Sequence, residues 1–153
     1  MATVLYDEWE MACCGSPFEI GYNIEWTVSK VNKKDMDCLD KDQKIKNLAP
    51  YFITDYHYES HTPYSPDFLI LSGIISKITI ICVSYTQSQN NPQLLVPVSG
   101  FTWNVKNSEY RTNPYIRYRL RVNKYLDVDA YRVVIENPAI RPCLPKDWGI
   151  ENL

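Results

Sequence analysis

The sequence has no large excess of charge of either sign, no internal repeat and no low-complexity stretch. Its 153 residues include 16 Lys and Arg against 18 Asp and Glu, so the formal net charge is −2. A nearly neutral chain gives no bulk electrostatic reason to expect a nucleic acid or an anionic membrane as partner. The 45% hydrophobic fraction and the length predict one folded domain over residues 1–153.

Signals for export and for zinc knuckles are also missing. The N-terminus has neither a basic segment nor an apolar one, which argues against a signal peptide. The five cysteines are odd in number and contain no Cys-x-x-Cys pair. These features predict a cytoplasmic protein with reduced thiols, no membrane attachment and no zinc knuckle.

The longest apolar run, residues 68–85, allows two interpretations, a membrane span or a buried strand. Its 18 residues are marginal in length for a span. Lys77, near its centre, would cost about 3 kcal/mol in a bilayer, and Gly73 interrupts the run. Because β-branched Ile is frequent here, we predict one long buried strand or two short ones, with Cys82 in the core.

Alternation of apolar and polar residues at a period of two dominates the rest of the chain. The clearest apolar face is formed by Ile20, Tyr22, Ile24, Trp26 and Val28. Such alternation is typical of half-buried strands. The pattern predicts strands over residues 20–30, 68–85, 93–105, 115–122 and 126–135.

Helical signals are few. Asp40 and Gln43 resemble a capping box, and the short apolar stripe after them ends at Pro50. This pattern predicts one helix of about two turns, near residues 41–48. Residues 51–58 are a candidate for a further strand.

The C-terminal residues 137–153 are rich in proline, which predicts an extended, irregular tail. We expect Trp148 to pack this tail onto the body of the domain. Several short strands with a single short helix indicate an all-β fold. The expected architecture is a small, strongly bent antiparallel barrel, SH3-like, or a sandwich.

The hairpin between the last two predicted strands has a register that its apolar residues decide. Only a three-residue loop, 123–125, keeps the apolar residues of both strands on one face. That register sets Arg121 opposite Asp127 and Arg119 opposite Asp129. We therefore expect these arginines to form cross-strand ion pairs.

Residues 9–26 have the unusual pattern Trp-x-Met-x-Cys-Cys-Gly-x-Pro-Phe-x-x-Gly-x-x-x-x-Trp. The pattern resembles the opening of a family of small bacterial proteins, mostly actinobacterial, known only as a domain of unknown function. A looser likeness follows around Tyr58, Glu59 and His61, and at Gly73 with the strand after it. The resemblance implies a bacterial protein but no particular activity.

The stretch His57-Tyr58-Glu59-Ser60-His61 carries the residue types most suited to chemistry. In a strand, His57, Glu59 and His61 would project from one face, as ligands of a divalent metal do. Cys13 or Cys14 could supply a fourth ligand or a thiolate nucleophile beside a histidine. His-x-Glu-x-His is not an established ligand spacing, and this stretch offers three ligands at most. We therefore expect the protein to bind no stoichiometric zinc and no cofactor, and we assign no catalytic residue.

Tyrosines in the same region favour a binding function. Tyr56, Tyr58 and Tyr64 lie in a loop-like segment, where we expect some of them to be exposed as anchors for a partner. The expected function is a bacterial cytoplasmic binding domain, immunity- or adaptor-like, whose partner is another protein.

Two other functions stay open at this point. One is a metal- or thiol-dependent enzyme that uses the histidine and cysteine segments. The other is a nucleic-acid-binding barrel that uses the stripe Arg117, Arg119 and Arg121.

Trp26 gives a direct test of the predicted strand face. Because it shares that face with Ile24 and Val28, Trp26→Ala should lower the free energy of unfolding by roughly 3–5 kcal/mol. Chemical denaturation measures the change. A variant as stable as the wild type would place Trp26 outside the core.

Overall fold

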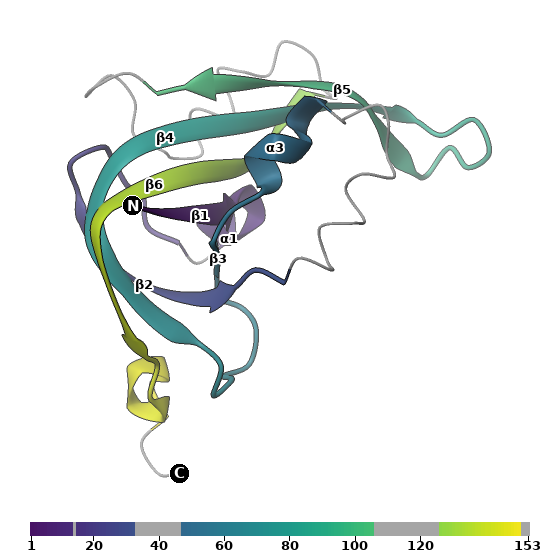
Figure 1. Cartoon of the computed structure of the whole chain (residues 1–153). Helices are drawn as coiled ribbons and strands as arrows, with labels where there is room; N and C mark the ends of the chain where they lie inside the picture. Colours follow the sequence, from purple (N-terminus) through teal and green to yellow (C-terminus); the bar gives the residue numbers. More distant parts are fainter. Residues whose placement is uncertain (14, 33–46, 106–125, 151–153) are drawn as a thin grey trace.

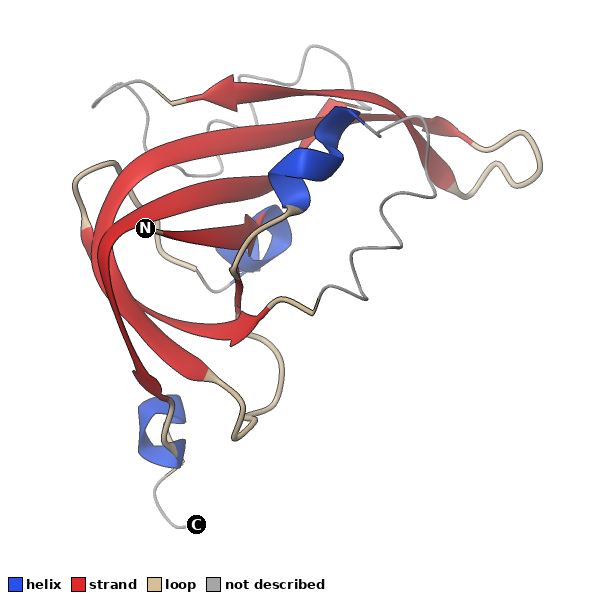
Figure 2. Cartoon of the chain, in the orientation of Figure 1, coloured by secondary structure: helices blue, strands red, loops and turns tan. Residues whose placement is uncertain are grey.

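Six β-strands make up most of the described chain (Figures 1 and 2). The structure, a computed structural model, describes residues 1–13, 15–32, 47–105 and 126–150. The strands are β1 (Ala2–Asp7), β2 (Asn23–Lys30), β3 (Tyr56–Tyr58), β4 (Leu69–Gln87), β5 (Leu95–Asn104) and β6 (Leu126–Pro142). The helical elements are short: α1 (Glu8–Cys13), α3 (Ala49–Phe52) and the 3₁₀ helix η3 (Pro145–Trp148). The predicted all-β class is confirmed.

The strands close into a small barrel because β2 pairs with two different strands. The sheet order is β2-β3-β1-β6-β4-β5, and β2 also pairs with the first part of β4. The ring β1–β6–β4–β2–β3 is therefore closed, and β5 continues along β4 beyond it. Among the described strands, β1 and β3 alone run parallel. The bent barrel was predicted, but the expectation of a wholly antiparallel sheet was wrong at this pair.

A sharp bend in β4 makes the closure possible. Leu69 to Ile74 pair with β2, whereas Thr79 to Gln87 pair with β5, so the strand changes direction between them. The pairing of β4 with β6 shifts register at Gly73. A Cβ atom at Gly73 would lie 2.7 Å from the carbonyl oxygen of Glu136 on β6. Only glycine allows the two backbones to approach this closely, and Figure 1 shows both strands curving together.

The middle of β4 buries side chains on both of its faces. Ile80 and Cys82 belong to the main core inside the barrel. Ile81 and Val83 belong to a second apolar cluster with Leu48, beside α3. Burial on two sides explains why this strand is a continuous apolar run rather than an alternating one. The prediction that Cys82 is a core residue is confirmed.

The run 68–85 forms one long strand rather than two short ones. Lys77 lies at an exposed position of β4, where its charge reaches solvent. Within the described residues, the structure contains no helix that is long and apolar enough to cross a membrane.

The face predicted for the first alternating strand is confirmed for residues 24–28 of β2, whereas Tyr22, which precedes the strand, is 42% exposed. Ile24 and Val28 are buried, and Trp26 is partly buried against the same core. Its ring contacts Tyr6 and Phe18 at centroid distances of 5.3 and 5.0 Å. The strand begins at Asn23 rather than at residue 20.

The prolines behave differently from the sequence-based expectation. Pro50 does not end a helix: it lies in the first turn of α3, where its missing N–H costs nothing. The expected irregular tail is wrong for residues 137–142, because β6 continues to Pro142. Pro138 fits this strand because it falls at the register shift opposite Gly73, where no residue pairs with it. Trp148 packs on Phe68, with ring centroids 5.4 Å apart.

Two further expectations fall partly outside the described residues. Most of the predicted helix 41–48 lies there, as does the whole predicted strand 115–122 with its arginine stripe. On β6, the Asp129 carboxylate accepts a hydrogen bond from Tyr85 Oη at 2.9 Å. Of the candidate strand 51–58, the structure forms β3 at 56–58 only.

The bend gives a second stability test. Gly73→Ala should lower the free energy of unfolding by about 1–3 kcal/mol, because the new methyl group overlaps β6. Gly149→Asn is the matched control, since Gly149 also has a positive φ (79°) but no atom within 4 Å of a Cβ, and Asn tolerates that conformation. Equal stability of the two variants in urea denaturation would contradict this account of the bend.

Candidate functional site

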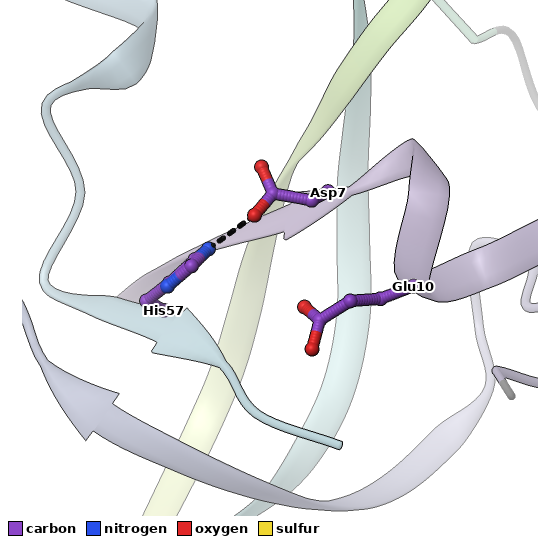
Figure 3. A group of neighbouring side chains, drawn as sticks. All are labelled: Asp7, Glu10 and His57. Atoms are coloured by element: carbon purple, nitrogen blue, oxygen red, sulfur yellow. Dashed lines mark hydrogen bonds and ion pairs between the residues drawn. The ribbon is translucent and has the colours of Figure 1, made fainter. Parts of the chain in front are cut away.

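A cluster of ionisable side chains lies where β1, α1 and β3 meet. Asp7 is the last residue of β1, Glu10 lies in α1, and His57 is the middle residue of β3. β1 and β3 pair in parallel, and His57 lies opposite Leu5. Asp7 follows Leu5 by two residues on β1, so it lies near His57. Figure 3 shows the three side chains converging from these elements.

His57 is the centre of this cluster. Its Nε2 lies 2.7 Å from Asp7 Oδ2, and its Nδ1 lies 3.7 Å from Glu59 Oε1. The hydrogen bond to Asp7, followed by the interaction with Glu59, raises the pKa of His57 to about 10. The imidazole is therefore protonated at neutral pH and held between two carboxylates.

Glu10 lies deeper than the other carboxylates and is only 2% exposed. Its Oε1 accepts hydrogen bonds from the Ser60 amide at 3.1 Å and from Ser60 Oγ at 3.2 Å. Its Oε2 is buried and has no hydrogen-bond partner among the described residues. Burial raises the pKa of Glu10, and the bonds from Ser60 offset only part of that increase.

Glu59 is the best-satisfied carboxylate of the group. Ser29 on β2 donates to Oε1 at 2.8 Å, and Thr62 donates to Oε2 at 2.7 Å. Burial would raise the pKa of Glu59, but the interaction with His57 and the hydrogen bonds from Thr62 and Ser29 outweigh burial and lower it. Glu59 is therefore ionised and fixed in place beside the imidazole.

An open hollow of about 450 Å³ lies on the other side of Glu59. Aromatic and acidic side chains share its lining, which consists of Glu25, Trp26, Thr27, Tyr58, Glu59, Ser60, Asp147 and Trp148. It joins β2, the end of β3 and η3. Below, we call it the aromatic–acidic hollow.

Arg141 on β6 is paired with two of the acids that line the hollow. Its guanidinium donates to both oxygens of Asp147, at 2.8 and 3.0 Å, and lies 4.0 Å from Glu25. The bonds from Arg141 lower the pKa of Asp147 to about 2. These carboxylates therefore already hold one planar cation, the guanidinium of Arg141.

The aromatic wall of the hollow is continuous with the barrel core. Tyr58 stacks on Tyr6 at a centroid distance of 3.9 Å and meets the edge of Trp26 at 5.7 Å. Tyr56 also packs against the main core, and Tyr64 packs near Phe68. All three of these tyrosines are partly buried by contacts made far along the chain, so each exposes only part of its ring to a partner.

The structure brings together only part of the residue set predicted from the sequence. His57 and Glu59 are neighbours, but His61 instead lies against Trp9, with ring centroids 5.1 Å apart. Cys13 is exposed at the end of α1 and is not part of the cluster around His57, and Cys14 lies outside the described residues.

Sequence reasoning missed Asp7 and Glu10. The acidic run Asp7-Glu8-Trp9-Glu10 was the available signal, but its distance of about fifty residues from His57 concealed the contact. Nothing in that run follows the spacing of a known metal or catalytic motif.

The opening motif has a structural explanation at this site. Gly15 donates its N–H to the carbonyl oxygen of Glu10 at 2.8 Å, which ends the turn that carries Glu10. A Cβ at Gly15 would overlap the Tyr6 hydroxyl and lie 2.9 Å from Met11 Cα. Met11 and Phe18 of the same motif are buried in the main core. The motif therefore fixes α1 and Glu10 against the barrel.

The protonation of His57 can be measured directly. We expect its imidazole to titrate near pH 10 by NMR, and Asp7→Asn to lower that pKa because the strongest bond is lost. The raised pKa stabilises the fold fully below pH 6.5, and this contribution disappears as the pH rises through about 10. Titration of His57 near pH 6.5 in the wild type would contradict the geometry.

Comparisons with known proteins give a family but no activity. No curated protein and no solved structure matches the chain. The sequence model of a family of unknown function, DUF6578, matches residues 1–124. The match extends well beyond the opening motif and includes Asp7, Glu10, His57 and Glu59. Because it covers more than half of the sequence, the chain belongs to this family of unknown function.

Proposed function

We propose that the protein is a binding domain that holds a lysine or arginine side chain of a protein partner in the aromatic–acidic hollow. The observation that carries this proposal is the lining itself, in which Trp26, Tyr58 and Trp148 stand beside Glu25, Glu59 and Asp147.

Aromatic faces and carboxylates together suit a cationic side chain. A cation over an aromatic ring gains about 0.5–1 kcal/mol at an exposed site and more when it is desolvated. The three aromatic residues are partly buried, so their orientation is set by the core before a partner binds. Rigid aromatic anchors of this kind dominate many protein interfaces.

The charges around the hollow favour a basic partner. Asp147 is matched by Arg141, and Glu59 by His57. The Glu25 side chain is 69% exposed, and its nearest cation in the described residues is Arg141, at 4.0 Å. An incoming cation would therefore pair with Glu25 while its stem lies on the aromatic wall. Such a lining disfavours phosphate groups, and hence nucleic acid.

The proposal is tested with short peptides that differ only in one central residue. We expect a Gly/Ser peptide with a central Arg or Lys to change the NMR signals of the Trp26 and Trp148 indoles, and a peptide with Glu there to change neither. Added salt should weaken the interaction because Glu25 is exposed.

Matched variants locate the binding surface. Glu25→Gln should weaken peptide binding by roughly 2–5-fold, the effect of one exposed charge pair. Asp67→Asn removes the same charge at an exposed position outside the lining and should leave affinity unchanged. Trp148→Ala should weaken binding more than Trp148→Phe, which retains an aromatic face. Equal binding of the Arg and Glu peptides, or no effect of Glu25→Gln, would reject the proposal.

A further inference from the structure

We propose that Asp7, Glu10 and His57 form a binding site for one divalent transition-metal ion, with Glu59 as the outer partner of the histidine. One oxygen of each carboxylate and a ring nitrogen of His57 all lie within 4.8 Å of one another. This ligand set differs from the one considered in the sequence, since it replaces Glu59 and His61 with two residues from the N-terminal segment. Its three ligands lie outside the lining of the aromatic–acidic hollow, although Glu59 belongs to both sites.

Glu10 supplies an observation beyond the clustering of acidic groups. Its side chain is 2% exposed, and Oε2 has no hydrogen-bond partner in the described part of the chain. An unsatisfied buried carboxylate oxygen is costly and calls for a specific explanation, such as a bound ion. In Figure 3 the Glu10 carboxylate points toward the gap beside Asp7 and His57. A metal ion there would satisfy this oxygen.

The distances suit a shared ion. Oxygen and nitrogen ligands lie about 2.0–2.2 Å from a metal such as zinc, so neighbouring ligand atoms are about 3–3.5 Å apart. Asp7 Oδ2 and His57 Nε2, now hydrogen-bonded at 2.7 Å, would separate by about 0.5 Å to share an ion. All three ligand atoms lie within 4.8 Å of one another, so small side-chain shifts would bring them to these separations. Two carboxylates and one imidazole are ligands that bind Zn²⁺, Mn²⁺ and Fe²⁺.

The second ring nitrogen of His57 has the partner that metal-bound histidines usually have. Such histidines donate their other N–H to a carboxylate, which fixes the tautomer and the ring orientation. His57 Nδ1 faces Glu59 Oε1 at 3.7 Å, and Ser29 and Thr62 hold that carboxylate in place. When a metal binds Nε2, the proton now on Nε2 is released to solvent, and Nδ1–H remains directed at Glu59.

The site is open enough to exchange ions and water. The side chain of His57 is 34% exposed and that of Asp7 is 23% exposed, whereas Glu10 closes the inner side. Three protein ligands leave coordination positions for water or a substrate, as in catalytic metal sites. The proposed metal site is therefore an open one rather than a closed structural site.

Metal binding is tested on untagged full-length protein stripped with chelator. Isothermal titration with Zn²⁺ and with Mn²⁺ should give about one ion per chain for at least one of them. Co²⁺ should give visible absorption bands of a bound ion. His57→Ala should abolish binding, and Glu59→Gln should weaken it about 10–100-fold, as outer-shell changes do.

Two further variants make the test specific. Glu10→Gln keeps the size of the side chain and an oxygen for Ser60, so it should fold while losing metal affinity. His61→Ala is the matched control, because His61 contacts Trp9 and lies outside the ligand set. Circular dichroism checks that each variant is folded.

The possible outcomes separate cleanly. Loss of binding in His57→Ala and Glu10→Gln, with His61→Ala unchanged, supports the site. No stoichiometric binding by the wild type would reject it. Binding that survives Glu10→Gln but disappears in His61→Ala would also reject it. Peptide binding to the hollow is measured separately, so failure of one proposal leaves the other intact.

Discussion

The bend of β4 is the constraint on which the barrel depends, because one strand serves two different neighbours along the same edge. Its first part pairs with β2 and its second part with β5, while β6 follows the other edge throughout. The pairing of β2 with β3 then completes the ring of strands. A side chain at position 73 would overlap the backbone of β6, so it would disturb both of the strands that bend together.

Closure of the ring also assembles the polar cluster. Ser29 comes from β2, His57 from β3, Asp7 from β1 and Glu10 from the helix that follows β1. Their contacts are satisfied only when β3 lies between β1 and β2. Beneath them, Tyr58 of β3 stacks on Tyr6 of β1, which joins these two strands from the core side. Polar and apolar contacts therefore support one arrangement of these strands.

Local patterns predicted much of the fold but little of the site. The alternation through Ile24, Trp26 and Val28 identified β2, since burial on one face leaves a period of two. The same logic identified β4 from its apolar run. Pro138 predicted an irregular tail but lies within β6, because proline is excluded from regular pairing but not from a bulge. These patterns report what a residue does within its own strand.

The site depends on contacts that no local pattern contains. His57 and Glu59 were recognised as chemically suited residues because they are close in sequence. Asp7 reaches His57 through a parallel pair of strands about fifty residues apart, which a period of two cannot reveal. His61 was grouped with His57 on the assumption of a continuing strand, yet β3 ends at Tyr58. Only the strand order shows that Asp7, and not His61, is the neighbour of His57.

The pairing of the first strand with the last one has a consequence for how the chain acquires its structure. Ala2 to Asp7 pair with Ile135 to Ala130, so β1 finds its antiparallel partner only near the end of the chain. During synthesis, β1 can pair with β6 only after residues 130–135 have been made, and such distant pairing makes folding slow. The region that matches the family ends at residue 124, before β6 begins. A fragment cut at that boundary would lack the strand that lies between β1 and β4, and both would be left with an open edge.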